Sequence, residues 1–571
     1  MTSTIGRRLA AAQGWRASAT ALLALTALAG CGGSDSGAPP VEDIPTFALD
    51  RDTFDCKAAP EASCDQVTIY ATPVHLERRD RTPFVYVRSV DGATGIPVQS
   101  MGDMKQLPDG RWQMSFRLAP DRPAGVYVGA VHVDLPPDLI PPAGKRYRGA
   151  RLNYRLEVTA VPTATTPLPA TVAGATPWSD AAPGSTRSGY VPVSLDASKF
   201  SRRWMAWLVG ATDTSTPGLP ALVDGQILVP QARVIDGATG PNALALSESD
   251  GKPQWTATIA GAGLTHVVPA GGRAVWSSLQ ATTPGTLPLY SAVSTNRTNG
   301  AVLATRSLNE NNPPRFWLAT DDTLYLTDAI TGEVAAVNPG DLQTRWTAKA
   351  DPSPSRVLPV HGQFGATVAD GVVYTHSSTT FRAFRATDGG QLLDVTADGG
   401  QSLALKLYES QTPVIADANT VLAMDRPRYV QESASANAGV QALARADGSV
   451  RWTVRAPFRG LPVTANGVVY LANQGNKAIE ARSLADGSVL WSWPMDAADR
   501  VWQQTMVLTD THLFVSTDRQ TVAIDLATHQ AVWRYSLGGW LGMSQRGTLL
   551  IVTTNTATTA DPMALTAVTL R

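Results

Sequence analysis

Charged residues and cysteines are both scarce in this 571-residue chain. Only 17% of the residues are charged, and 47 Lys and Arg against 48 Asp and Glu give a net charge of -1. Without runs of Lys and Arg the chain lacks the basic surface that phosphate contacts require, which argues against nucleic-acid binding. Because 43% of the residues are apolar, the composition also argues against a disordered chain.

No apolar run is long enough to cross a bilayer as a stable helix. The longest near the N-terminus, residues 19–27, has about nine residues and follows Arg7, Arg8 and Arg16. This order predicts a signal peptide over residues 1–30. The run ends in Leu28, Ala29, Gly30 and Cys31, which resembles the lipobox of bacterial lipoproteins.

The lipobox resemblance implies that Cys31 is lipidated and anchors the chain to a membrane. The alternative is an ordinary cleavage site with a chance cysteine. Residues 31–40 are rich in Gly, Ser and Pro and predict a flexible tether. Gly32 stands where Asp holds Gram-negative lipoproteins in the inner membrane, so the resemblance implies an outer-membrane lipoprotein. We expect it to face the periplasm rather than the cell surface.

Only two further cysteines are present, Cys56 and Cys64. In an oxidising compartment this pair predicts a disulfide. A metal or redox pair is the alternative, but it lacks the C-x-x-C spacing and a neighbouring His. No C-x-x-C-H haem site occurs in the sequence.

Short alternating strands fill residues 41–161 and predict a small β-sandwich. Residues 124–133 and 154–158 resemble the last strands of bacterial immunoglobulin-like modules. Residues 162–190 are rich in Pro, Thr, Ala and Gly without hydrophobic periodicity, which predicts a linker.

Residues 191–571 carry an eightfold repeat of a turn followed by a strand. Each copy leads to a second unit, a tight turn with a Trp four residues after its Gly in the clearest forms, as at Trp255 and Trp452. Related copies end at Trp346, Trp491 and Trp533, whereas Ala304 and Leu393 replace the Trp in degenerate copies. The eighth copy reaches the C-terminus before any Trp. We therefore predict that a strand around Trp204 completes the last sheet and that these six Trp pack between neighbouring sheets.

Trp204 and Trp533 are 329 residues apart, which is seven intervals of 47 residues. This length suits a four-stranded propeller blade. Residues 523–533, with Ala523, Asp525 and Trp533, fit the pattern A-x-D-x-x-[TD]-G-x-x-x-W apart from His529 at the Gly position. The pattern resembles the repeat of the pyrroloquinoline-quinone (PQQ)-like β-propellers. The resemblance implies an all-β fold, an eight-bladed propeller preceded by the immunoglobulin-like sandwich.

The PQQ-like family contains quinoprotein alcohol dehydrogenases and also the non-enzymatic propeller lipoprotein of the outer-membrane barrel-assembly machinery. The dehydrogenases hold PQQ in the central channel, typically between a Trp and a disulfide of adjacent cysteines, with Ca²⁺ beside it. The repeat region here has no Cys, and its Asp and Asn residues fall at turns. We therefore expect no cofactor, no metal and no catalytic residues.

Other catalytic patterns are also missing from the sequence. The seven His are scattered without an H-E-x-x-H or H-x-x-E-H pair, and no G-x-S-x-G or phosphate-loop motif occurs. Six less constrained Trp are open to either core packing or a binding face: Trp207, Trp276, Trp317, Trp493, Trp502 and Trp540.

The sequence therefore predicts a lipid-anchored envelope propeller that binds a partner protein and is not an enzyme. The family resemblance makes outer-membrane protein assembly the named process. The alternatives are a PQQ-dependent dehydrogenase or a carbohydrate-binding envelope protein, and both would use the central channel.

Overall fold

The computed structural model describes residues 46–571 with internal gaps. The gaps are 59–66, 76–83, 89–97, 102–104, 119–124, 135–148, 160–165, 180–181, 209–219, 231–241, 262, 280–289, 309–316, 321, 328–332, 349–364, 377–379, 397–407, 411, 428–437 and 554–562. The predicted signal peptide, tether, Cys31 and Cys64 lie outside the described residues. Within the described part, no helix is long and apolar enough to cross a membrane.

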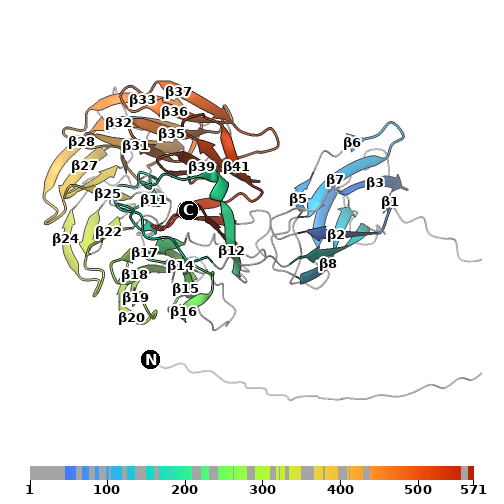
Figure 1. Ribbon diagram of the computed structural model, residues 1–571, viewed down its shortest axis with the longest axis horizontal. Coiled ribbons are helices and arrows are strands. Elements are labelled where there is room, and N and C mark those ends of the chain that lie inside the picture. The colour runs from blue at the N-terminus through green and yellow to red at the C-terminus, as the bar shows by residue number, and fades with distance from the viewer. Residues whose placement is uncertain are drawn as a thin grey trace, which may run out of the picture.

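Strands make up nearly all the regular structure, so the prediction of an all-β fold is confirmed. The one helical element in the described part is a short 3-10 turn, η2 (Ala197–Lys199). Figure 1 shows a ring of sheets from green to red and a separate group of blue strands.

The blue strands form two sheets that face each other across one core. The first sheet has the order β1 (Thr46–Leu49), β3 (Val67–Val74), β7 (Trp112–Leu118) and β5 (Val98–Met101), with β6 (Lys105–Gln106) also on β7. The second has the order β2 (Thr53–Ala58), β9 (Ala150–Val158), β8 (Gly125–Asp134) and β4 (Phe84–Arg88). Ile69, Met114, Val131 and Leu156 are buried in one hydrophobic cluster between them. Along β9 every second residue is buried, at Leu152, Tyr154, Leu156 and Val158, as expected for a two-sheet sandwich.

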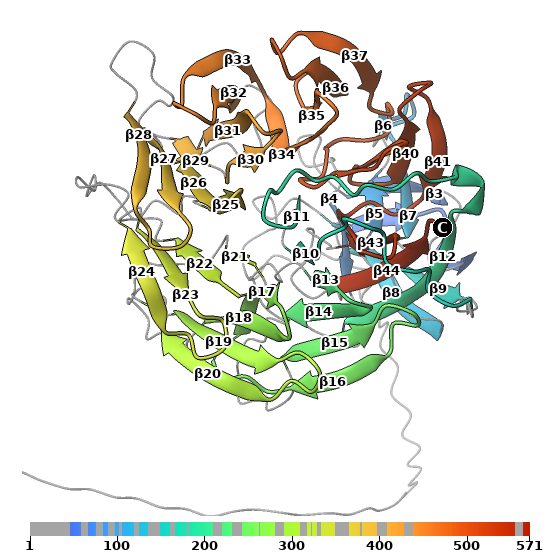
Figure 2. The same cartoon turned by 60° about the vertical axis from the view of Figure 1, so that its left-hand side comes forward.

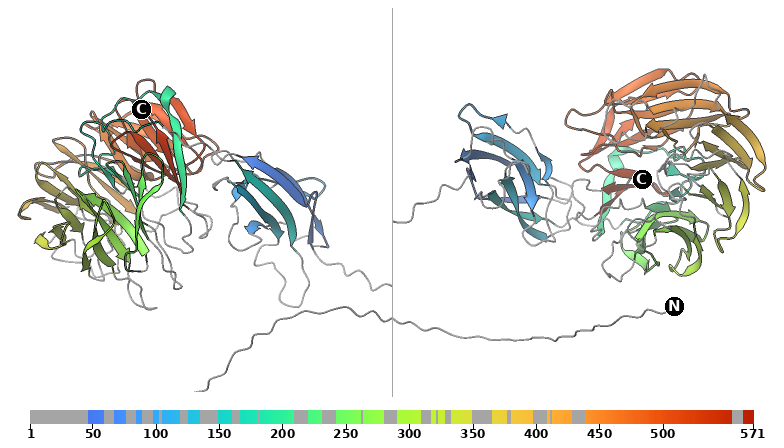
Figure 3. Two further views of the ribbon diagram at one scale, coloured as in Figure 1. Left: turned by 60° about the horizontal axis from the view of Figure 1, so that its bottom comes forward. Right: turned by 180° about the vertical axis from the view of Figure 1, so that it is seen from behind.

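The ring consists of eight antiparallel sheets, which we call blades 1 to 8 (Figure 3). Blade 1 contains β13 (Ala221–Val223), β14 (Gln226–Pro230), β15 (Ala243–Ser247) and β16 (Pro253–Ala257). Blade 2 contains β17 (Gly263–Ala270), β18 (Arg273–Leu279), β19 (Tyr290–Asn296) and β20 (Val302–Ser307). Blade 3 contains β21 (Leu318–Ala319), β22 (Leu324–Thr327), β23 (Val334–Val337) and β24 (Thr344–Ala348). Blade 4 contains β25 (Ala366–Ala369), β26 (Val372–His376), β27 (Thr380–Arg385) and β28 (Gln391–Thr396).

The remaining blades follow in the same order. Blade 5 contains β29 (Tyr408–Ser410), β30 (Val414–Ile415), β31 (Thr420–Pro427), β32 (Ala438–Ala444) and β33 (Val450–Ala456). Blade 6 contains β34 (Phe458–Ala465), β35 (Val468–Asn473), β36 (Ala478–Ser483) and β37 (Val489–Pro494). Blade 7 contains β38 (Val507–Leu508), β39 (His512–Ser516), β40 (Thr521–Asp525) and β41 (Ala531–Tyr535). Blade 8 contains β42 (Trp540–Met543), β43 (Thr548–Thr553), β44 (Met563–Thr569) and β12 (Ser201–Leu208).

Blade 8 closes the ring by joining the two ends of the repeat region. β12 pairs antiparallel with β44, from Ser201 opposite Thr569 to Leu208 opposite Met563. The predicted completion of the last sheet by the Trp204 strand is therefore confirmed. The closing strand ties residues more than 350 positions apart in the sequence, which keeps the ring from opening at its ends.

Candidate functional site

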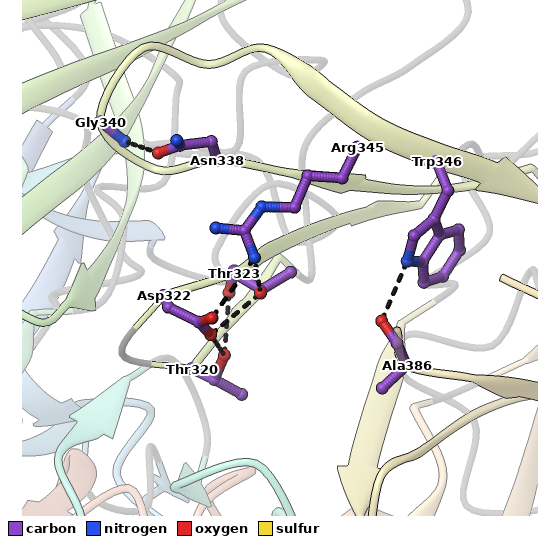
Figure 4. Close-up of polar contacts among 8 residues, drawn as sticks. All are labelled: Thr320, Asp322, Thr323, Asn338, Gly340, Arg345, Trp346 and Ala386. Carbon is purple, nitrogen blue, oxygen red and sulfur yellow. Dashed lines mark hydrogen bonds and ion pairs between the residues drawn. The ribbon is translucent and has the colours of Figure 1, made fainter. Parts of the chain in front are cut away.

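The predicted blade Trp residues lie on the outermost strands and join each blade to the next. Four indole nitrogens donate hydrogen bonds to a backbone carbonyl of the following blade: Trp204 to Glu248 (2.7 Å), Trp255 to Arg297 (2.7 Å), Trp346 to Ala386 (2.9 Å) and Trp452 to Leu484 (2.7 Å). Figure 4 shows the Trp346 bond across the seam between blades 3 and 4. Each of these four indoles therefore links two sheets, both by packing and by a hydrogen bond.

The same four Trp rings lie against the turn glycine of the following blade. A Cβ on that glycine would lie 2.5–2.9 Å from the ring at Gly251, Gly300, Gly389 and Gly487. Side-chain Cβ atoms do not approach this closely, so only glycine leaves room for the indole. The repeated Gly and the repeated Trp are therefore two halves of one contact.

Two of the six Trp use other partners. Trp491 stacks on His529, which replaces the turn Gly, with ring centroids 4.4 Å apart. Trp533 meets Phe200 edge-on at 5.7 Å, because β12 replaces the missing turn of blade 8. Where Ala304 replaces the Trp, Leu342 of the next blade belongs to the same hydrophobic cluster. These three seams are thus filled by residues other than a Trp and a turn Gly.

Of the six Trp open to either role, four are buried in the core: Trp276, Trp317, Trp493 and Trp502. The side chain of Trp207 lies outside the described residues, and Trp540 is half-buried. These four Trp side chains therefore belong to the core and do not form a binding face.

The predicted chemistry-bearing residues are scattered in the structure. Cys56 is disulfide-bonded, while its predicted partner Cys64 lies outside the described residues. His376 is fully buried, and the loss of solvation lowers its pKa to about 4. Within the described part of the chain, no three His, Cys, Asp or Glu side chains are grouped so that they could hold a metal ion.

The structure brings residues 177–179 and 182–193, which we call the channel segment, into the centre of the ring. Figure 2 shows its short strands β10 (Trp178–Ser179) and β11 (Ala182–Pro183) inside the circle of blades. Trp178 pairs with Leu222 on β13, the innermost strand of blade 1. After β11, the chain runs along the inner edges of other blades.

Blades 4 to 7 each bind this segment through the backbone of the innermost strand. The amides that donate to segment carbonyls are Val368 to Ser185 (2.9 Å), Ile415 to Thr186 (3.0 Å), Thr464 to Ser188 (2.9 Å) and Leu508 to Gly189 (2.8 Å); Val191 donates back to Leu508 (2.8 Å). These four blades therefore present amides at one level around the ring.

The level of these bonds follows the repeat. Leu222, Val368, Thr464 and Leu508 each stand two residues before the first turn residue of their blade, namely Asp224, Asp370, Asn466 and Asp510. In three of those turns, Asp224, Asp370 and Asn466 have positive φ values of 45–52°. The channel segment therefore lies at the turn end of the channel and follows its rim.

Side chains hold the chain before the channel segment, the middle of the segment and its exit. Arg203, Arg546 and Arg571 donate to the carbonyls of Thr166, Pro169 and Ala170, just before the segment. Arg187, buried inside the ring, donates to the Trp317 carbonyl of blade 3 (3.0 Å). At the exit, Tyr190 donates to Asp510, and burial together with this bond raises the pKa of Tyr190 to about 12.

The channel segment corrects the predicted linker over residues 162–190. The composition predicts a linker because Pro, Gly, Ser and Thr without periodicity normally describe unpacked chain. Here the hydrogen bonds to the blades are made by backbone groups, so they leave no pattern of side chains in the sequence. Trp178 and the apolar Val191 and Val193 are the one usable signal, since all three are buried.

The channel segment bears on the expected absence of PQQ. At the turn end of the ring its backbone is bonded to blades 4 to 7. The repeat region has no cysteine, and its described residues offer no acidic cluster for Ca²⁺. The disulfide of adjacent cysteines that lies beside PQQ in the dehydrogenases therefore has no counterpart in the repeat region.

Comparison with known proteins agrees with the repeat. Residues 330–569 match the family model of outer membrane protein assembly factor BamB. The structure resembles that of BamB from Moraxella catarrhalis with a TM-score of 0.46 and 12% identity, over 64% of this chain and 99% of that one. It also resembles the computationally designed Ika8 protein with a TM-score of 0.38 and 11% identity, over 57% of this chain and 85% of that one. No curated protein matches. Residues 330–569 are thus similar to the repeat of the PQQ-like β-propellers.

Proposed function

We propose that this chain is a lipid-anchored envelope scaffold whose propeller binds a partner protein during outer-membrane protein assembly. One observation carries the proposal: the chain's own segment is hydrogen-bonded to the inner strands of blades 4 to 7, in the part of the ring where a cofactor or sugar would bind. The outer surface of the ring is then the part available to a ligand. The match of residues 330–569 to the BamB family model supports assembly as the process.

The outer strands offer apolar side chains to such a partner. Among the described residues of the propeller, the exposed large hydrophobic ones are Val302, Leu303, Leu392, Val450, Val489, Leu490 and Val532. All seven lie on the outermost strand of a blade, β20, β28, β33, β37 or β41. Single exposed apolar residues are ordinary, but a set confined to the outer strands gives definite positions at which to look for contacts.

Site-specific crosslinking in intact cells tests the proposal. A photoreactive amino acid is placed at Leu490, which is 54% exposed, or at Leu392. We expect at least one of these positions to form a discrete adduct with a component of the barrel-assembly machinery. The matched control places the same group at Trp317, which is fully buried. If the exposed positions form no adduct beyond this control, the ring's outer strands are not the contact surface.

A further inference from the structure

The inner edges of blades 4 to 7 have the properties of a peptide-binding site. The residues that donate to the channel segment include Val368, Ile415 and Leu508, whose side chains are 8% exposed or less. Buried amides need a partner, because an amide that is removed from water and left unpaired destabilises the fold. Backbone bonding to an extended segment is the way in which sheet edges bind peptides.

After β11 the channel segment is bound to the blades but belongs to none of them, whereas β10 and β11 extend the sheet of blade 1. Except for the short β10 and β11, its described residues form no strand of a sheet, and its central residues are Gly184, Ser185, Thr186, Arg187, Ser188 and Gly189. The backbone of Gly189 has φ +70°, and a Cβ there would overlap Cγ1 of Val463. A close approach of backbone to the ring therefore requires glycine at this point.

We propose that the inner edges of blades 4 to 7 form a binding site for an extended peptide rich in Gly, Ser and Thr, which residues 185–191 occupy in cis. A partner segment of the same chemistry binds there when these residues leave. The second statement rests on the proposed scaffold function, whereas the first stands without any partner.

Gly189→Ala tests whether residues 185–191 are a bound segment or an integral part of the ring. The new methyl group clashes with Val463, so we expect the segment to leave while the blades stay folded. Gly467→Ala is the matched control. Gly467 lies in the same blade as Val463 and has φ +75°, but a Cβ added to it would have no atom within 4 Å. It carries the backbone strain without the clash.

Hydrogen exchange and peptide binding read out the result in the full chain. In Gly189→Ala, the amides of Val368, Ile415, Thr464 and Leu508 should exchange at least about tenfold faster, with β26 and β35 unchanged. A labelled synthetic peptide of residues 182–193 should bind this variant at least about tenfold more tightly than wild type or Gly467→Ala, because the site is no longer occupied in cis. Unchanged exchange, or exchange that rises throughout the blades, overturns the proposal, as does equal peptide binding.

Native-state exchange of the wild type covers the case in which Gly189→Ala does not fold. A cis ligand predicts that the four amides open together at a lower free energy than those of β26 and β35. Opening only with the whole ring overturns the proposal. Neither measurement contains a partner protein, so failure of crosslinking would remove the scaffold function and leave this site standing.

Discussion

At the scale of the residue, the Trp and the turn Gly of successive blades form a single contact. The Trp452 ring lies against Gly487, and its indole nitrogen donates to the Leu484 carbonyl. An indole buried in this way contributes both apolar area and a satisfied hydrogen bond. Seam residues should therefore dominate the stability of the ring.

Trp452→Ala tests that expectation. The change removes the ring and leaves the Leu484 carbonyl without its donor, so we expect the free energy of unfolding to fall by about 3–5 kcal/mol. Denaturant unfolding followed by intrinsic fluorescence and circular dichroism measures the loss. Val489→Ala is the control, because Val489 is half exposed and should change stability by less than about 1 kcal/mol. Equal effects of the two changes would show that the seam is not a main source of stability.

His376 makes the stability of the ring depend on pH. Neither ring nitrogen has a hydrogen-bond partner among the described residues, and burial lowers the pKa from 6.5 to about 4. Below pH 6.5, His376 therefore becomes protonated in the unfolded chain, whereas in the folded chain it stays neutral until about pH 4. This contribution to stability is complete above pH 6.5 and is lost as the pH falls through that window.

His376→Leu should remove this part of the pH dependence. We expect the difference in unfolding free energy between about pH 7 and about pH 4 to be smaller in the variant, by on the order of 3 kcal/mol. Urea unfolding of both proteins across this range provides the comparison. Identical pH profiles would mean that His376 is protonated in the folded chain or does not remain buried.

At the scale of the element, the seam between blades 8 and 1 closes the ring. Trp204 on β12 packs against Gly251 in the turn between β15 and β16. This contact joins the first strand of the repeat region to the first complete blade, and the β12–β44 ladder joins it to the last. A fault at this seam should therefore loosen the whole ring.

Gly251→Ala and Gly371→Ala form a matched pair for this seam. Both glycines have positive φ (+71° and +73°), but a Cβ at Gly251 would lie 2.7 Å from Trp204, whereas a Cβ at Gly371 would have no atom within 4 Å. We expect both to lower the melting temperature and Gly251→Ala to cost about 1–3 kcal/mol more. Calorimetry of the two variants measures the difference. Equal losses would assign the whole effect to the backbone rather than to the Trp contact.

Much of the fold can be predicted because the repeat marks its own elements. The eight turn-strand units, the outer-strand Trp and the completion of the last sheet around Trp204 are all visible as side-chain patterns. The channel segment escapes prediction because its bonds are made by backbone carbonyls, such as that of Ser188. The stacking of Trp491 on His529 could not be predicted either, because a single sequence does not show which residue is contacted by the His that replaces the turn Gly.

At the scale of the whole molecule, one chain combines a predicted lipid anchor, a sandwich and a propeller. If Cys31 carries the lipid, Cys31→Ala should move the protein from the membrane fraction to the soluble envelope fraction without changing its melting temperature. Membrane fractionation followed by immunoblotting measures this, with Cys56→Ala, which removes the disulfide, as a cysteine control. A Cys31→Ala protein that stays in the membrane fraction would contradict the predicted anchor.

Crosslinking of whole cells followed by mass spectrometry tests most directly whether the anchored propeller binds an envelope protein. Wild type and Cys31→Ala are crosslinked at equal expression and purified under denaturing conditions. We expect barrel-assembly components among the wild-type adducts, and fewer of them in Cys31→Ala. Repeated recovery of wild-type protein without any such component would contradict the claim.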